Sequence, residues 1–473
     1  MITSRSQITD LVPSLEGKVV LPDDAGFDAA RQAWSLAVDQ RPSAVVFPES
    51  AADVAAAVRL ARALGQRIAP QGTGHNAEPL GSLVNTILLK TQRMRAVAID
   101  PAARTARVEA GVLAGQLAEA AAAHGLAAVT GTAASVGVVG YTLGGGIGAL
   151  SRRFGLASSR VRAVDLVTAG GELVRADHEH LPELFWALRG GGGSFGVVTA
   201  LEIELLPVTR AYAGTLWYPI ERAVEVLHTW RELLEAGPPE ELSTIGRMVS
   251  FPPVPEAPEA VRGKSFALVH VYHVGDRAQA DGLLEPLRAL GPVNDTVRTV
   301  PMPSLREVHM DSPQPVPVAG DGLMLGDLPA EALDALLEVA MPGGGPQLAT
   351  VELRHLEGEL ARAQPQHAAV ASIPAKHALY AGGFAPTPDI RTSTKSQVEA
   401  IQQALAPWAI RYLHPNFAET KHAPENLWTE QAYQRLRNIK AMVDPDNVIR
   451  ANHQIPPPLT DRSAGSSTQR SAP

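Results

Sequence analysis

The sequence contains no cysteine among its 473 residues. This absence excludes disulfide bonds, thiolate metal sites, a cysteine nucleophile and a thioether bond to a cofactor. Aromatic side chains are also scarce, at 5% of the chain, which argues against a broad aromatic-lined carbohydrate groove.

The chain also lacks an excess of basic residues. Its net charge is −8, and the lysines and arginines are scattered, so no nucleic-acid partner is expected. Residues 2–24 have neither the charged-then-apolar order of a signal peptide nor a run long enough to span a membrane. From these absences we predict a cytoplasmic protein without a membrane partner.

Glycine, by contrast, is abundant and gathers in three segments. The first, "QGTGHN" at residues 71–76, follows a strand–helix–strand pattern over residues 43–70, in which Ser50 is placed to cap the helix and Gly65 to end it. A glycine-rich turn after such a unit presents backbone N–H groups to a phosphate.

The other two segments cover residues 131–156 and 189–199. They hold too much glycine for helix or strand interiors, where each glycine costs roughly 0.5–1 kcal/mol relative to alanine. Together the three segments indicate a large, flat ligand that carries phosphate. His75 lies in the first of them, and from the residues alone it is a polar turn residue, a hydrogen-bonding partner, a base or a covalent tether.

Two shorter patterns point elsewhere, and the order of elements argues against both. Gly144, Gly146 and Ala149, with Asp165 downstream, fit a weak dinucleotide fingerprint, but no amphipathic helix opens there and Asp165 is expected to begin a strand. Ser194 matches a hydrolase G-x-S-x-G, yet the predicted order is helix, turn, strand, the reverse of a nucleophile elbow. The histidines of "HEH" at residues 178–180 are expected to be solvated, and no metal site is predicted.

The pattern of strands and helices predicts an α+β fold. We expect one domain over residues 1–208, an antiparallel sheet with helices over residues 209–411, a returning segment over residues 412–458 and a disordered tail over residues 459–473.

Five segments, in order, resemble the FAD-linked oxidases of the vanillyl-alcohol oxidase superfamily, within the berberine-bridge-enzyme-like group. They are "RPSAVVFPESAADVAAAVRLAR", "QGTGHN", "VGVVGYTLGGGIGALSRRFGL", "PELFWALRGGGGSFGVVT" and the pair "YLHPNFAE" and "YQRLRNIKAMVDPDNVIRANHQI". The resemblance implies a two-lobed PCMH-type FAD-binding domain and a second, substrate-binding domain. It also implies that His75 tethers the flavin through the 8α-methyl group. A second tether, from a cysteine at Ala133 or Ala134, is ruled out, so the flavin is expected to be attached through His75 alone or not to be covalently attached.

The resemblance assigns FAD contacts to residues of all three glycine-rich segments and of the C-terminal segment. These are Gln71, Gly72, Thr73, Gly74, His75, Asn76, Thr130, Gly131, Val136, Gly140, Tyr141, Gly144, Gly145, Gly146, Gly196, Val197, Val198, Asn416 and Asn452.

The implied reaction is a two-electron oxidation of a small alcohol or amine, in which flavin N5 accepts a hydride and O₂ is reduced to hydrogen peroxide. Val136 occupies the position that gates oxygen in the family, and its small side chain favours an oxidase. A dehydrogenase with another electron acceptor and a non-catalytic flavin-binding protein are the alternatives. The chain departs from the family at Ser194, where asparagine is usual, and at His414 and Pro415, which intrude into the aromatic motif after Tyr412.

Candidate catalytic residues lie in the second half of the chain. Strand alternation in "LATVELRHLEG" places Glu352 and Arg354 on one face, where they orient or deprotonate the substrate, or else form a surface ion pair. Tyr412 is the second candidate. His309 and Asp311 are the third, on a proline-rich loop that either reaches the cavity or is solvated.

Overall fold

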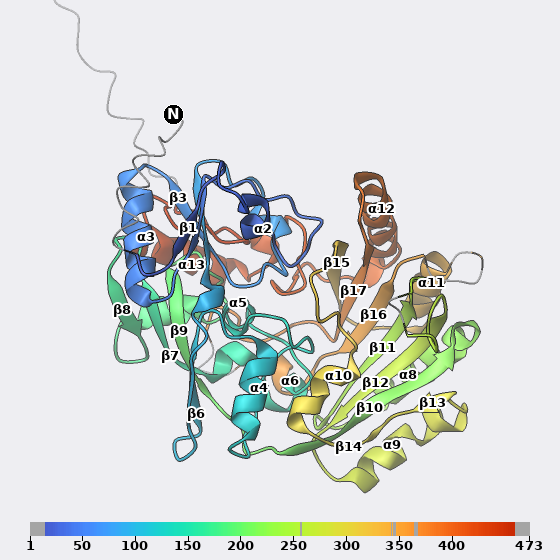
Figure 1. Ribbon diagram of the computed structural model, residues 1–473. Helices are drawn as coiled ribbons and strands as arrows, with labels where there is room; N and C mark the ends of the chain where they lie inside the picture. Colours follow the sequence, from blue (N-terminus) through green and yellow to red (C-terminus); the bar gives the residue numbers. More distant parts are fainter. Residues whose placement is uncertain (1–14, 256–257, 342, 344–346, 364–367, 459–473) are drawn as a thin grey trace, which may run out of the picture.

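The computed structural model describes residues 15–255, 258–341, 343, 347–363 and 368–458, and it shows two α+β lobes side by side (Figure 1). The predicted tail at residues 459–473 lies outside the described residues. In the part of the chain that is described, no helix is both long and apolar enough to cross a membrane.

The first lobe begins with a four-stranded sheet in the order β1-β2-β4-β3. Its strands are β1 (Lys18–Val20), β2 (Ala44–Phe47), β3 (Arg67–Gln71) and β4 (Thr86–Lys90), after which the chain continues into a five-stranded sheet. Strands β2, β4 and β3 run parallel, so their carboxyl ends share one edge. The register places Gln71 beside Lys90 at that edge.

The crossover from β2 to β3 is α3 (Ala51–Ala63), as predicted. The Ser50 hydroxyl accepts a hydrogen bond from the Asp53 N–H at 3.2 Å, and Gly65 ends the helix with a φ of 63°. This left-handed conformation favours glycine because it has no Cβ. The apolar face of α3 packs on the sheet through Val54, Val58 and Ala61, which are fully buried.

The second sheet of this lobe is antiparallel, in the order β5-β6-β9-β7-β8. Its strands are β5 (Val97–Asp100), β6 (Thr105–Glu109), β7 (Val161–Val167), β8 (Leu173–Ala176) and β9 (Val197–Glu204). The helices of this region are α2 (Phe27–Arg31), α4 (Ala114–Ala122), α5 (Val138–Leu143), α6 (Ser151–Phe154) and α7 (Pro182–Leu188). Asp165 lies inside β7, not at its start, and its carboxylate pairs with Arg107 and Arg175.

The second lobe is built on one antiparallel sheet in the order β13-β10-β12-β11-β16-β17-β15, with β14 paired to β10. Its strands are β10 (Arg210–Pro219), β11 (Leu242–Ser250), β12 (Ser265–His273), β13 (Asn294–Asp295), β14 (Arg298–Pro301), β15 (Val318–Leu325), β16 (Thr350–His355) and β17 (His377–Phe384). Its helices are α8 (Ala223–Glu235), α9 (Arg277–Ala289), α10 (Leu305–Val308), α11 (Ala330–Ala340) and α12 (Pro388–Ala404). The α+β class and the antiparallel second sheet with its helices are confirmed.

One face of this sheet packs against helices α8, α9, α11 and α12 to form a separate hydrophobic core. Val351 and Leu353 of β16 point into that core. Glu352 and Arg354 therefore point to the opposite face, as the alternation predicts.

The C-terminal segment returns to the first lobe through α13 (Glu430–Val443). After this helix the Ile68 N–H donates to the Val448 carbonyl at 2.9 Å, and the Arg450 N–H donates to the Ile68 carbonyl at 2.9 Å. The last described residues thus lie against β3, the strand that leads into the first glycine-rich loop.

Candidate active site

The loop after β3 is shaped to receive an anion. The backbone N–H groups of residues 72–76 donate no hydrogen bond to any described residue. The residues of this loop are half-buried, and successive backbone N–H groups without a protein acceptor form an arrangement that binds anions. The N–H groups of this loop therefore fit the phosphate-bearing part of FAD. The side-chain oxygens Gln71 Oε1 and Asn76 Oδ1 are buried without a partner among the described residues, but they are acceptors and do not contribute to that fit.

His75 is held in one orientation by three neighbours. Its Nδ1 lies 2.8 Å from the Thr73 hydroxyl, and its Nε2 lies 3.3 Å from the Ser135 hydroxyl. The Trp34 indole stacks on its ring at 4.0 Å between centroids. Burial lowers the pKa of His75 to about 4, so the imidazole is neutral near pH 7 and keeps a nitrogen lone pair.

The second glycine-rich segment packs closely on the C-terminal segment. A Cβ on Gly144 would lie 2.7 Å from Asn416 Nδ2, and one on Gly145 would lie 2.7 Å from His414 Nε2. The Asn416 side chain accepts a hydrogen bond from the Gly146 N–H at 2.9 Å and donates one to the Tyr141 carbonyl at 3.3 Å. Asn416 thus braces the glycine segment. Gly140 has open space where a Cβ would stand.

The other residues to which the resemblance assigns FAD contacts are placed in different surroundings. The Asn76 side chain donates to the carbonyls of Pro415 and Ala418, while the Asn452 side chain donates to the Asn76 carbonyl at 3.4 Å. Val197 and Val198, which follow Gly196, have their side chains in hydrophobic cores. Their contacts with FAD stay predictions.

A buried ionic cluster lies on the face of the second sheet that is opposite the helices. The register pairs Arg247 with Glu352 and Glu352 with Tyr380, so these three side chains form a row across β11, β16 and β17. Glu352 is 2% exposed. Its carboxylate accepts hydrogen bonds from Arg354 at 2.7 Å and from His309 Nε2 at 2.8 Å. The alternative interpretation of Glu352 and Arg354 as a surface ion pair is therefore wrong.

His309 is also buried, which contradicts the alternative that its proline-rich loop is solvated. It lies directly after α10, and its Nδ1 lies 2.8 Å from Asp311 Oδ1. Burial by itself disfavours an imidazolium, but Asp311 and Glu352 on either side raise the pKa of His309. Burial likewise opposes ionisation of Glu352, yet Arg354 and His309 hold the pKa of that carboxyl well below its usual range.

The ionic cluster borders the glycine-rich segments of the first lobe, since Arg354 lines one cavity together with Thr132 and Gly148. The negative charge of Asp311 acts on His75, where it opposes the lowering of the pKa by burial. The positive charge of Arg354 acts on Tyr141 of the second glycine-rich segment. The Arg354 guanidinium also lies 5.3 Å from the centroid of the Phe417 ring. The fold thus brings together four regions that are far apart in the sequence: the two glycine-rich segments, the ionic cluster and the C-terminal segment.

Glu419, which the sequence did not single out as catalytic, lies beside the cluster. Its carboxylate accepts a hydrogen bond from the Tyr380 hydroxyl at 3.0 Å, and its backbone N–H donates to Asp321 at 2.9 Å. Burial, reinforced by the negative charge of Asp321, raises the pKa of Glu419 to about 7. The signal available in the sequence was its place at the end of "YLHPNFAE", one residue after Ala418.

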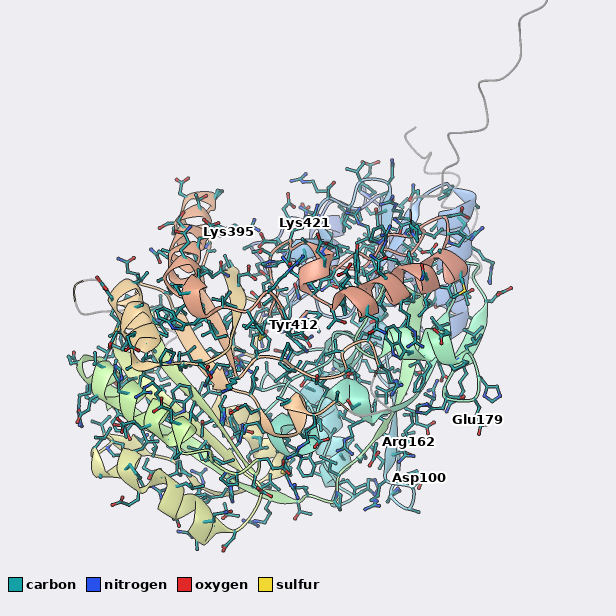
Figure 2. All side chains as sticks on the ribbon, turned by 180° about the vertical axis from the view of Figure 1, so that it is seen from behind. Asp100, Arg162, Glu179, Lys395, Tyr412 and Lys421 are labelled. Carbon is teal, nitrogen blue, oxygen red and sulfur yellow. The ribbon has the colours of Figure 1, made fainter. Side chains whose placement is uncertain are left out.

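Tyr412 does not join this cluster through any hydrogen bond between described residues. It lies between the two lobes (Figure 2), with its ring against the first-lobe core and 6.4 Å from the ring of His414. Its hydroxyl is buried and has no hydrogen-bond partner in the described part of the chain, and burial raises the pKa of Tyr412. A catalytic role for Tyr412 stays a prediction.

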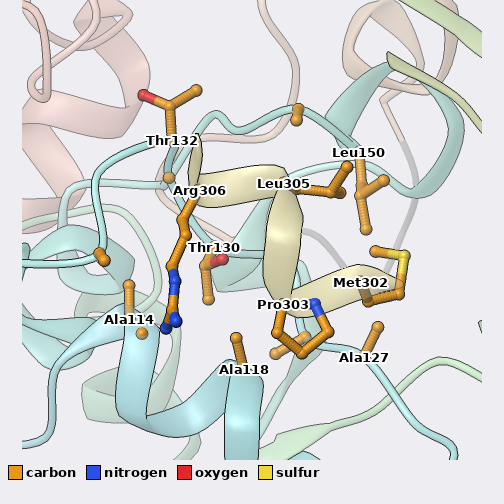
Figure 3. Close-up of a pocket in the computed structure, with 15 residues that line it drawn as sticks. Ala114, Ala118, Ala127, Thr130, Thr132, Leu150, Met302, Pro303, Leu305 and Arg306 are labelled. Carbon is orange, nitrogen blue, oxygen red and sulfur yellow. The ribbon is translucent and has the colours of Figure 1, made fainter. Parts of the chain in front are cut away.

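A small cavity lies between α4 and the segment that leads into α10 (Figure 3). Its volume is about 40 Å³, and alanine and glycine make up much of its lining, together with Thr130, Gly131 and Arg306. A second cavity shares Thr132 and Ala149 with the first and reaches Arg354 and Tyr272. At that size the first cavity holds a few water molecules, not an organic substrate.

Comparison with known proteins agrees with this geometry. A family model described as an FAD binding domain matches residues 42–177, and one described as berberine and berberine-like matches residues 411–456. The chain is 31% identical to (R)-6-hydroxynicotine oxidase of Paenarthrobacter nicotinovorans, over 94% of this chain and 97% of that protein.

Solved structures show the same fold. The crystal structure of 6-hydroxy-D-nicotine oxidase from Arthrobacter nicotinovorans superposes with a TM-score of 0.79 at 26% identity, over 93% of this chain and 98% of that one. Berberine-bridge-like protein 1 of Physcomitrella patens superposes with a TM-score of 0.82 at 20% identity, over 96% of this chain and 99% of that one.

Proposed function

The chain belongs to the berberine-bridge-enzyme-like group of FAD-linked oxidoreductases, and from that premise we propose that it is an oxidase of a small alcohol or amine. In this reaction a hydride leaves the carbon next to the oxygen or nitrogen, a base takes the proton, and O₂ is reduced to hydrogen peroxide. When bound, FAD supplies the two-electron acceptor.

The observation that carries the proposal is the convergence of two kinds of group in one site. A loop of unpaired backbone N–H groups presents a neutral His75, and the charged cluster around Glu352 is close enough for Asp311 to act on that histidine. The first group fits the cofactor, while the second fits a polar substrate that must be oriented and deprotonated.

Within this site the carboxylates have different roles. Both oxygens of Glu352 already accept hydrogen bonds, and its low pKa makes it a weak base, so we assign it to holding Arg354 and His309 in place. Glu419 has a pKa of about 7, and among the described residues its carboxylate accepts one hydrogen bond, from Tyr380. A base with a pKa near the working pH transfers protons efficiently, so Glu419 is the proton acceptor in this proposal.

The electron acceptor is tested by supplying oxygen or an alternative. We expect the purified protein to turn over a panel of small amines and alcohols in air, with one hydrogen peroxide formed per substrate oxidised. Turnover with a quinone or dye but without peroxide would identify a dehydrogenase. Bound FAD that no substrate of the panel reduces would favour the flavin-binding protein without catalysis.

The tether is tested by acid denaturation. We expect yellow colour to remain in the pellet of the acid-precipitated wild-type protein and to move to the supernatant in the His75→Ala variant. The reason is that the neutral, oriented imidazole is the nucleophile that would attach the flavin. Absorbance at the flavin maximum in both fractions measures the result.

Ser135→Ala is the matched control for this variant. It removes the 3.3 Å contact to Nε2 but leaves the imidazole, so the pellet should stay yellow. Flavin released from the wild-type protein into the supernatant would show that His75 only contacts the cofactor.

A further inference from the structure

Lys90 is a buried lysine without an anionic partner among the residues that the structure describes. It ends β4 and is 6% exposed, and its ammonium donates to the backbone carbonyl of Gln32. No carboxylate among the described residues forms an ion pair with it, and burial lowers the pKa of Lys90 to about 8. A lysine that is buried in this way costs free energy unless something else balances its charge.

The side chain of Lys90 points to the face over which the first glycine-rich loop folds. Directly paired residues of parallel strands share a face, so Lys90 and Gln71 point the same way. On that face the Gln71 amide donates to Gln40 Oε1 at 3.1 Å. A Cβ on Gly74 would lie 3.0 Å from the side-chain carbon Cδ of Gln71.

Residues 32–34 contact both Lys90 and the first glycine-rich loop. Gln32, which accepts from Lys90, precedes Ala33, whose Cβ lies 2.9 Å from the position of a Cβ on Gly74. The next N–H, that of Trp34, donates to the Thr73 carbonyl at 3.0 Å. Lys90 and the unpaired N–H groups therefore lie against the same short stretch, residues 32–40.

This stretch offers further donors that have no acceptor. Trp34 Nε1 and Gln40 Nε2 are buried and unpaired among the described residues. The nearby unpaired acceptors, Gln71 Oε1 and Asn76 Oδ1, carry no formal charge. An ammonium and two side-chain N–H groups along this stretch, with the backbone N–H groups of the loop packed on it, are complementary to a multiply charged anion.

We propose that Lys90 and residues 32–40 form the second wall of the site for the FAD diphosphate, with Lys90 as its counter-charge. This inference rests on FAD being the cofactor, and it adds residues that lie outside the glycine-rich loop. It explains why a lysine is tolerated inside the sheet edge, because the diphosphate would replace the missing anionic partner.

The test measures flavin affinity in the His75→Ala background, where binding is reversible. Fluorescence titrations of flavin-free protein compare FAD with riboflavin, which carries no phosphate. We expect Lys90→Gln to weaken FAD binding by at least about tenfold and to leave riboflavin binding unchanged. ADP, which carries the diphosphate without the isoalloxazine ring, should lose affinity as FAD does. Glutamine keeps a donor for the Gln32 carbonyl, so the local structure is retained.

Two further variants control for charge and folding. Lys90→Arg keeps the positive charge and should retain the preference for FAD over riboflavin. Lys18→Met removes the same charge from an exposed position of the same sheet and should change neither affinity. An equal loss for FAD and riboflavin in Lys90→Gln, or no loss for either, would overturn the inference while FAD binding itself stands. Wild-type protein that takes up no FAD at all would overturn both this inference and the proposed function.

Discussion

Replacing Glu419 by glutamine is expected to lower kcat/KM for the oxidised substrate by roughly 10²–10⁴-fold, the usual contribution of a general base. Glutamine has nearly the same shape and still accepts the hydrogen bond from Tyr380. It has no basic oxygen, however, so the proton of the substrate O–H or N–H must pass to water. Steady-state rates under air, or the rate of flavin reduction without oxygen, measure the loss.

The pH profile gives this prediction a second, independent readout. Burial and Asp321 raise the pKa of Glu419 to about 7, so below that pH the carboxyl is protonated and cannot accept a proton. The wild-type kcat/KM should therefore rise with pH and level off above about 7. In Glu419→Gln this acidic limb should disappear, because no group with that pKa remains in the role.

Glu352→Gln is the matched control, since it removes the other carboxylate of the same site. It leaves His309 and Arg354 without their shared partner, so a lower kcat is expected there as well. The acidic limb should persist, because Glu419 is still present, but it should move to a somewhat lower pH because the negative charge of Glu352 helps to raise the pKa of Glu419. A profile in which Glu352→Gln loses the limb and Glu419→Gln keeps it would assign the base to Glu352 instead.

Local patterns in the sequence were enough to predict the elements that present the site. The Ser50 cap and the Gly65 stop define α3, since both depend on backbone groups within a few residues. The alternation in β16 separates Glu352 from Val351 because successive side chains of a strand point to opposite faces. The order of neighbouring elements was enough to exclude Ser194 as a nucleophile, because it lies between a helix and a strand, in that order. The structure agrees, and the Ser194 hydroxyl accepts a hydrogen bond from the Ile455 N–H.

Burial could not be predicted in the same way, because it depends on residues distant in the chain. A polar loop such as that of His309 normally faces water, and only the packing of α10 against the second sheet encloses it. Glu419 has an unremarkable neighbourhood in sequence. Its pKa is raised by burial and by the negative charge of Asp321, which lies more than thirty residues away along the chain. Lys90 looks like the end of an ordinary strand until the register places it beside Gln71.

Replacing Lys440 by methionine is expected to cause the largest loss of stability. Lys440 and Asp444 are both fully buried and joined at 2.6 Å. The ammonium also donates to the Ser194 carbonyl at 2.7 Å, and the carboxylate accepts the N–H groups of Val448 and Ile449. Removing one partner of a buried pair leaves the other charge uncompensated, which costs about 3–5 kcal/mol. Thermal unfolding followed by circular dichroism would show a markedly lower melting temperature.

The comparison that isolates burial is Lys376→Met, which removes a lysine from an exposed ion pair with Asp327. Water screens that pair, so the melting temperature of Lys376→Met should match that of the wild type. Lys440→Met combined with Asp444→Leu removes both buried charges and should recover part of the loss, because no unpaired charge remains. Equal melting temperatures for Lys440→Met and Lys376→Met would mean that water reaches the buried pair.

The position of the Lys440–Asp444 pair links the stability of the fold to the site. Asp444 binds the backbone of the turn that places Val448 against β3. Because β3 leads directly into the loop that carries His75, the pair matters for the site as well as for stability.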